Sequence, residues 1–215
     1  VAPAHLGHFS GIEEIATAKA EIFEGVEAGG HALINRDDRQ WKLLERAARA
    51  AGIDHVWGFG EHARSTFRLA GWKPEGEGSR IAVKMAGKEL SITIGAPGRH
   101  MVQNALAVLG AAYLAGAPID KVAAALSGMR AEPGRGRRYR LAHPSGGEIL
   151  VIDESYNANP ASMKIGLDLL GAAEPPPGGR RIAVLGDMLE LGDHSRRLHE
   201  ALAGAVAAAQ ADLVL

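Results

Sequence analysis

A lysine near the start of the chain stands where packing alone does not explain it. Ser10 and Glu13 have the spacing of a capping box, and Gly25 suits the end of the helix that they would begin. Apolar residues at i, i+3 and i+4 spacing predict a buried stripe along this helix, with Lys19 in its middle. The stripe residues are Ile12, Ile15, Ala16, Ile22 and Phe23. An unpaired ammonium on a buried face costs free energy. Either its stem follows the edge of the core to water, or the lysine carries a modification that changes its charge near a phosphate or metal site.

Polar side chains follow the first predicted strand. A strand at His31–Asn35, a helix at Arg39–Ala51 and a strand at His55–Phe59 form a βαβ unit, which requires a parallel sheet. Ligands collect at the carboxyl ends of such strands, and three polar residues lie there: Asn35, Asp37 and Asp38. The same residue types also suit a turn and a helix cap, so both interpretations stay open.

An amide lies in the first turns of a later helix. Strands are predicted at Ser65–Leu69, Arg80–Met85 and Glu89–Ile94, the last two as an antiparallel hairpin with one wet face. A Gly- and Pro-rich loop is expected after the first of them. A helix then starts near Arg99 and carries Asn104. An amide can pair with an adenine edge, and it can equally make a hydrogen bond between helices.

Five arginines mark the predicted domain boundary. The segment Arg130–Arg140 contains them together with glycine and proline, a composition that cannot pack a core. We therefore expect two domains, 1–130 and 131–215. Arg135 lies on a glycine-flanked turn, which suits bidentate phosphate binding; a solvated linker is the alternative.

The second predicted domain has β–α–β–α–β order. An apolar strand, Glu148–Asp153, runs into an acidic and amide-rich loop, and further elements follow at Ala161–Leu170, Arg180–Leu185, Ser195–Ala209 and Leu213–Leu215. This order predicts an open, Rossmann-like sheet. Neither G-x-G-x-x-G nor G-x-x-x-x-G-K-[ST] occurs among the 215 residues, so no phosphate loop lies within them.

Composition excludes several classes of function. The net charge of −1 gives no support for nucleic acid or an acidic membrane surface as a partner. The chain has no cysteine, which excludes disulfides and zinc–thiolate sites. No apolar run approaches the roughly 20 residues of a membrane helix. The missing initial methionine and the final ADLVL segment favour a piece of a longer protein.

Six motifs in order resemble the Mur ligase family. They are AHLGHFSGIEEIATAKAEIFEG, INRDD, GRHMVQNALA, PGRG, IDESYNANPASM and AVLGDMLELG. The last two resemble the branch that joins D-alanyl-D-alanine to a UDP-MurNAc-tripeptide. The resemblance implies the end of a central ATPase domain, with a parallel sheet plus small antiparallel strands, followed by a truncated Rossmann-like C-terminal domain. It also implies that the N-terminal domain and phosphate loop are missing, and that this fragment alone is inactive.

The resemblance also implies roles for individual residues. Lys19 matches a lysine that CO₂ carbamylates and that helps to hold Mg²⁺ beside the γ-phosphate of ATP, and His5 matches a metal-binding histidine. Asn104 matches an asparagine that reads adenine, and Arg135 matches an arginine that reaches the γ-phosphate. Asp153 and Glu154 match an acidic pair near the ribose. Three further residues share that loop: Tyr156, Asn157 and Asn159.

The resemblance therefore predicts an ATP-dependent amide ligase of peptidoglycan synthesis that works through an acyl phosphate. ATP, Mg²⁺ and a carbamate on Lys19 are its expected cofactors. A monomer in the bacterial cytoplasm is expected, with no nucleic acid and no membrane insertion. The alternatives are a sibling Mur ligase, a folylpolyglutamate synthase-like enzyme, or a non-catalytic nucleotide-binding fragment.

Overall fold

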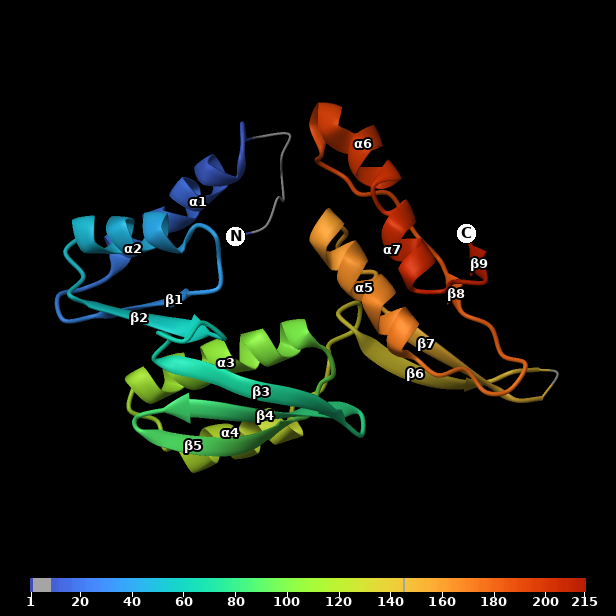
Figure 1. Cartoon of the computed structure of the whole chain (residues 1–215), viewed down its shortest axis with the longest axis horizontal. Coiled ribbons are helices and arrows are strands. Elements are labelled where there is room, and N and C mark those ends of the chain that lie inside the picture. Colours follow the sequence, from blue (N-terminus) through green and yellow to red (C-terminus); the bar gives the residue numbers. More distant parts are fainter. Residues whose placement is uncertain (2–8, 145) are drawn as a thin grey trace. The chain divides into compact units, whose positions relative to one another are not determined.

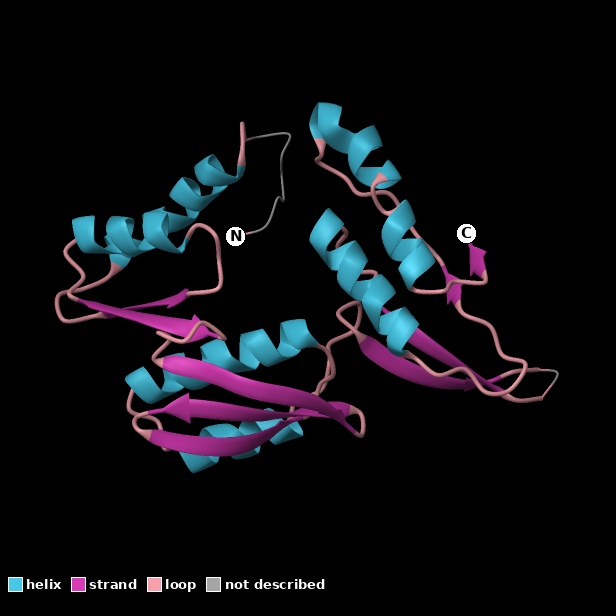
Figure 2. Ribbon diagram, viewed as in Figure 1, coloured by secondary structure: helices cyan, strands magenta, loops and turns pink. Residues whose placement is uncertain are grey.

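The computed structural model describes residues 1, 9–144 and 146–215. Contacts divide the chain between Arg130 and Ala131: the first compact unit is Ile12–Arg130 with Val1, and the second is Ala131–Leu215 together with the described residues 9–11. Each unit combines helices and strands (Figure 1). Figure 2 shows the same mixture by colour, so the chain is an α/β protein, as the sequence predicts.

The first unit is built on a five-stranded mixed sheet with the order β1-β2-β3-β4-β5. β1, β2 and β3 are parallel neighbours, whereas β3, β4 and β5 are antiparallel. The strands are β1 (His31–Asn35), β2 (His55–Gly60), β3 (Phe67–Glu75), β4 (Gly78–Met85) and β5 (Lys88–Ile94). The predicted parallel unit and the predicted hairpin therefore belong to one sheet.

β3 is longer than its sequence pattern indicates. The loop expected after Leu69 is strand as far as Glu75, because Lys73 pairs with Arg80 and Pro74 with Ser79 on β4. A shift in register between Leu69 and Gly71 accommodates the change. Pairing with a distant segment thus overrides the local preference of glycine and proline for a loop.

Helices cover both faces of the sheet in the first unit. They are α1 (Ile12–Ala20), the 3₁₀ helix η1 (Glu21–Gly25), α2 (Trp41–Ala50), α3 (Arg99–Leu114) and α4 (Ile119–Gly128). α3 and α4 pack against β3–β5 through residues such as Phe67, Ile94 and Leu106. Ile34 of β1 packs instead with Trp41 and the α1–α2 side. β1 is therefore buried between two apolar clusters, and its carboxyl end is held rigidly.

The second unit has two small sheets and a helical layer. β6 (Arg137–Ala142) and β7 (Glu148–Asp153) are antiparallel, and β8 (Ile182–Ala183) and β9 (Leu213–Val214) are parallel. The helices are α5 (Pro160–Ala172), η2 (Gly192–His194), α6 (Ser195–Glu200) and α7 (Ala203–Ala208). The core is formed by Leu167, Ala183 and Ala209. The predicted β–α–β–α–β order is present, with the last helix divided in two at Ala201.

Candidate functional site

The predicted burial of Lys19 is wrong, and the alternative in which its side chain reaches water is the one that the structure shows. Its side chain is exposed, and the buried positions of α1 are Ile15, Ala16 and Ala20. After Ala20 the chain tightens into a 3₁₀ helix with about three residues per turn. That change of twist turns Ile22 outward, to 72% exposure, and leaves Phe23 buried. The helix begins at Ile12, and the predicted capping role of Ser10 stays a prediction.

The exposed Lys19 ammonium has no hydrogen-bond or ion-pair partner among residues 9–144 and 146–215. It lies in the last turn of α1, where the helix dipole favours a cation. Because Lys19 is exposed, the fold tolerates its charge without any modification. The amine is also accessible to small molecules. The predicted metal ligand His5 lies outside the described residues.

The polar residues after β1 form a tightly bonded turn. Asn35 Oδ1 accepts a hydrogen bond from the Asp37 N–H at 2.9 Å. The Asp37 carboxylate accepts from the backbone N–H groups of Glu61 at 2.7 Å and His62 at 2.8 Å, in the loop after β2. These hydrogen bonds agree with the interpretation of Asn35 and Asp37 as turn residues. They also link the carboxyl ends of the parallel strands β1 and β2.

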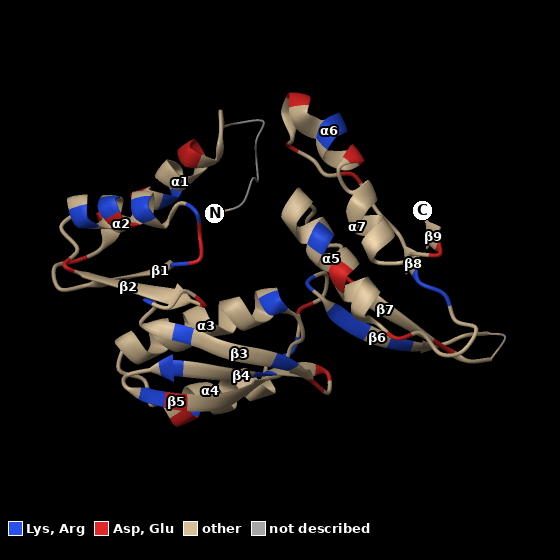
Figure 3. Cartoon of the chain, viewed as in Figure 1, with Lys and Arg blue, Asp and Glu red and all other residues tan. Residues whose placement is uncertain are grey.

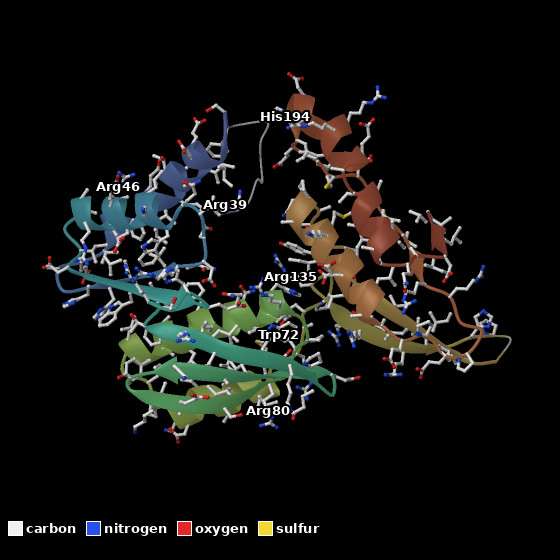
Figure 4. All side chains as sticks on the ribbon, viewed as in Figure 1. Arg39, Arg46, Trp72, Arg80, Arg135 and His194 are labelled. Carbon is white, nitrogen blue, oxygen red and sulfur yellow. The ribbon has the colours of Figure 1, made fainter. Side chains whose placement is uncertain are left out.

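The same turn borders an open pocket of about 480 Å³ within the first unit. The Asp38 carboxylate, which accepts from the Gln40 N–H at 2.7 Å, lies on its wall with Asp37. Two cations, Arg39 at the start of α2 and Arg99 at the start of α3, line it as well; Figure 4 labels Arg39. This is the edge of the sheet at which parallel strands present ligands.

The first turns of α3 supply side chains that the sequence analysis missed. Arg99 donates to Glu61 Oε1 through Nε at 3.1 Å and Nη2 at 2.7 Å. Gln103 Nε2 donates weakly to Asp37 Oδ2 at 3.4 Å. Their spacing of four residues on one helix, with acidic partners upstream, is the signal that could have indicated them.

Asn104 is exposed on α3, and its amide has no hydrogen-bond partner in the described part of the chain. The alternative of a hydrogen bond between helices is therefore not realised there. Its four-residue neighbour His100 is half-buried, and the Nδ1 atom is buried without a partner among those same residues. Burial lowers the pKa of His100 below its usual value.

In the second unit, Arg135 and the acidic loop form one structure. The Gly134 N–H donates to Asp153 Oδ2 at 2.9 Å, and the Tyr156 N–H donates to the Gly134 oxygen at 3.1 Å. The Arg135 guanidinium carbon lies 4.2 Å from the centroid of the Tyr156 ring. Figure 4 labels this arginine beside β6 and α5, and Figure 3 shows further basic residues along β6. The structure thus brings three predicted site residues together.

The adjacent carboxylates Asp153 and Glu154 have opposite environments. Hydrogen bonds from the Ser155 hydroxyl at 2.6 Å and from two backbone N–H groups lower the pKa of Asp153. Burial and the charge of Asp153 raise the pKa of Glu154, against the opposing effect of Arg135. Glu154 Oε1 is buried without a partner among the described residues.

The two asparagines of this loop shape its backbone. Asn159 is the N-cap of α5: its Oδ1 accepts from the N–H groups of Ala161 and Ser162, both at 3.0 Å, and Ser162 Oγ accepts in return from the Asn159 N–H. Asn157 Oδ1 accepts from the Ala158 N–H at 2.9 Å. Both amide oxygens accept hydrogen bonds within the loop itself. The nucleotide-binding roles of Asn157 and Asn159 therefore stay predictions.

A histidine that the sequence analysis did not single out anchors the GDMLELG loop. His199 on α6 accepts from the Met188 N–H through Nε2 at 3.0 Å, and its Nδ1 lies 2.8 Å from the Ser195 oxygen. Met188 and Leu191 are buried, whereas Leu189 is 75% exposed. The loop therefore holds Met188 and Leu191 inward and presents the two residues between them to solvent.

Neither a metal-ligand cluster nor a membrane-spanning helix occurs among residues 9–144 and 146–215. No group of three or more His, Asp or Glu side chains there has the arrangement of a metal site. None of the helices in this part of the chain combines the length and hydropathy needed to cross a bilayer.

Two family models match the chain over most of its length. The Mur ligase middle domain matches residues 1–112, and the Mur ligase, glutamate ligase domain matches residues 136–215. The UDP-N-acetylmuramoyl-tripeptide–D-alanyl-D-alanine ligase of Escherichia coli is 34% identical over 100% of this chain and 45% of its own length. The enzyme of the same name from Rickettsia prowazekii is 31% identical over 94% of this chain and 43% of its own length. The chain thus spans less than half the length of these relatives.

Solved structures show the same fold. MurF from Acinetobacter baumannii matches with a TM-score of 0.84 at 24% identity, over 100% of this chain and 49% of that one. MurF from Thermotoga maritima, solved in complex with ADP, matches with a TM-score of 0.78 at 20% identity, over 100% of this chain and 51% of that one.

Proposed function

This chain belongs to the Mur ligase family, and we propose that it forms the ATP-binding and C-terminal part of a ligase that joins D-alanyl-D-alanine to a UDP-MurNAc-tripeptide. The observation that carries the proposal is the 34% identity, over the whole chain, with a curated ligase of that activity. In the structure, hydrogen bonds hold the two loops with the most distinctive motifs: Gly134 N–H donates to Asp153, and Met188 N–H donates to His199.

The proposed reaction has two steps. The γ-phosphoryl group of ATP passes to the tripeptide carboxylate, giving an acyl phosphate and ADP. The amine of D-alanyl-D-alanine then attacks the acyl carbon, an amide bond forms, and phosphate leaves. Cationic side chains stabilise the charge on the phosphoryl oxygens during the first step.

We assign Arg135 to that charge and Asn104 to the adenine edge. Both side chains are exposed, and neither makes a side-chain hydrogen bond within the described part of the chain, so both have donors to offer. Asp153 and Glu154 are assigned to the neighbourhood of the ribose on the resemblance of their loop alone. Asn157 and Asn159 are proposed to order that loop at the nucleotide.

Lys19 is proposed to carry a carbamate that, with His5, contributes to binding Mg²⁺. A carbamate would convert the ammonium into an anion with oxygen ligands, which Mg²⁺ prefers. The exposure of Lys19 supports access by CO₂. The described residues alone do not make a complete magnesium site, so no catalytic step is derived through the metal. A monomeric, cytoplasmic enzyme completes the proposal.

The test is an assay of the whole gene product that contains this chain. With ATP, Mg²⁺ and UDP-MurNAc-tripeptide, D-alanyl-D-alanine should be joined and phosphate released in equal amounts. A free diamino acid or glutamate in place of the dipeptide should give no product. Product with either one and none with the dipeptide would favour a sibling ligase or a folylpolyglutamate synthase-like enzyme. Calorimetric binding of ATP without any ligation would favour a non-catalytic fragment.

The carbamate has a separate test. The protein in ¹³C-bicarbonate should show one carbamate resonance that is absent in Lys19→Ala and retained in Lys88→Ala, which removes another exposed lysine. Equal spectra and equal ligase activity for the wild type and Lys19→Ala would contradict this role. The 215 residues contain no phosphate-loop motif, so this segment by itself is expected to show no turnover.

A further inference from the structure

The Arg135 guanidinium lies over an aromatic ring and makes no ion pair with a carboxylate among the described residues. Its central carbon is 4.2 Å from the Tyr156 ring centroid, a cation–π distance. The Tyr156 side chain is 68% exposed, so the ring is not held in place by burial in a core. The stack is therefore a pairing between two solvent-exposed side chains, and packing of the domain does not require it.

The backbone holds these two side chains opposite each other. Three hydrogen bonds tie the turn to the loop: Gly134 N–H to Asp153 Oδ2 at 2.9 Å, Gly136 N–H to the Asp153 oxygen at 2.8 Å, and Tyr156 N–H to the Gly134 oxygen at 3.1 Å. Gly134 has φ +73°, and a Cβ there would lie 2.7 Å from Tyr156 Cβ. Only glycine permits this close approach, which brings Arg135 within reach of the ring.

A stacked guanidinium keeps its hydrogen-bonding edge free. Its N–H donors lie in the plane of the guanidinium, and a ring that attracts the cation through its π face offers no lone pair to them. Arg135 makes no side-chain hydrogen bond or ion pair within residues 9–144 and 146–215. A carboxylate support would compete with phosphate for the same donors, whereas an aromatic ring does not. An unsupported arginine would populate many rotamers, which lowers the fraction aimed at a ligand.

We propose that Tyr156 is a positioning residue that orients Arg135 for an anionic phosphate, leaving its bidentate donors unused until that phosphate arrives. The identity of the phosphate rests on the proposed function. The orientation of Arg135 by Tyr156 does not depend on that function. The ring acts on Arg135 and need not touch the nucleotide.

The orientation is tested on the 215-residue chain by NMR of arginine side chains. The ring current of Tyr156 should displace the Arg135 Nε–H resonance. Tyr156→Leu should shift that resonance toward its position in an unstructured peptide, and Tyr156→Phe should leave it nearly unchanged. Tyr139→Leu is the matched control and should leave the Arg135 resonance in place, because Tyr139 lies under Arg137 at 5.4 Å, both on β6. An Arg135 resonance that does not respond to Tyr156→Leu, in a variant with unchanged thermal midpoint, would overturn the proposal.

The consequence for phosphate is tested in the whole ligase. Tyr156→Leu should lower kcat by about 10- to 100-fold, the scale of a misplaced catalytic group, with the KM for UDP-MurNAc-tripeptide unchanged and with rescue by Tyr156→Phe. Arg135→Ala with Tyr156→Leu should be no slower than Arg135→Ala alone, since the ring acts only through the arginine. Additive losses would overturn the positioning role and leave the proposed function intact. No ligation by the wild type would refute the proposed function, and the NMR result would still decide the orientation.

Discussion

The carboxylate of Asp37 occupies the space that a side chain on Gly60 would need. A Cβ on Gly60 would overlap both Asp37 oxygens, and Gly60 has φ +131°, a conformation that other residues rarely adopt. From this position Asp37 accepts hydrogen bonds from the N–H groups of Glu61 and His62. The glycine thus permits the Asp37 carboxylate, in the turn after β1, to accept hydrogen bonds from the loop that follows β2.

Gly60→Ala should therefore destabilise the first unit by about 2 kcal/mol or more, from backbone strain and the overlap with Asp37. All three tryptophans lie in this unit, so urea titration followed by tryptophan fluorescence reports its unfolding. Gly71→Ala is the control, because Gly71 has an ordinary φ and no atom near its Cβ position. Equal midpoints for the two variants would contradict the packing described for Asp37.

His100 should make the first unit sensitive to mild acid. Burial lowers the pKa of His100 in the folded state, so the unfolded chain takes up a proton first as the pH falls. Stability is then fully present above the unfolded pKa of about 6.5 and declines toward the lower folded pKa. The N-terminal position on α3 adds to the cost of an imidazolium.

His100→Gln should flatten the dependence of the urea midpoint on pH between about 7.5 and 5.5, the interval that brackets the unfolded pKa. His62→Gln, at an exposed position of the same unit, should retain the wild-type slope. A wild-type slope in His100→Gln would show that another group is responsible.

Asp153 and Glu154 should respond to amide substitution in opposite directions. The pKa of Asp153 is lowered by its hydrogen bonds, so its charged form stabilises the fold at neutral pH, and that contribution is lost as the pH falls through the folded pKa. The pKa of Glu154 is raised by burial, so its charge opposes folding at neutral pH, and the opposition fades on acidification.

Asp153→Asn should accordingly speed hydrogen exchange of the Gly134 and Tyr156 amides at pH 7, and Glu154→Gln should slow it. Exchange rates that move in the same direction for both variants would contradict this assignment. The two substitutions have matched chemistry at neighbouring positions, so each serves as the control for the other.

His199 should set the stability of the GDMLELG loop. His199→Ala removes the acceptor of the Met188 N–H, a net loss of about 1 kcal/mol for one hydrogen bond. Exchange of the Met188 amide should rise about fivefold, which that energy implies. His194→Ala is the control, because the exposed His194 side chain makes no hydrogen bond to the loop. Unchanged protection in His199→Ala would refute the anchoring role.

Much of the architecture was predictable because its signals are local. The strand at His31–Asn35 was predicted to the residue, and the Glu148–Asp153 strand likewise. The element expected at Ala161–Leu170 is α5, which begins one residue earlier at Pro160, and its capping box between Asn159 and Ser162 became visible only in the structure. Each of these signals depends on residues within a few positions of one another.

The errors arise where the geometry departs from an ideal element. The stripe through Lys19 assumed 3.6 residues per turn as far as Phe23, whereas the chain becomes a 3₁₀ helix at Glu21. The change of twist puts Ile22 on the exposed side. Lys19 precedes that change and is exposed although Ile15 and Ala16, on the same face of α1, are buried. β3 extends through Pro74 for a different reason. Pairing with β4 keeps these residues in a strand, although their local preference is for a loop.

By itself, the sequence determined the order of the elements, the glycine-flanked turn of Arg135 and the family resemblance of the loops, since all three depend on neighbouring residues. The tertiary structure alone decided which groups meet. Asp37 bonds Glu61 and His62 across 24 and 25 positions, and Asp153 bonds Gly134 across 19. Local propensity carries no information about such pairs, because their geometry exists only after the sheet and the loops have packed. The placement of Arg135 on Tyr156 is a result of that packing.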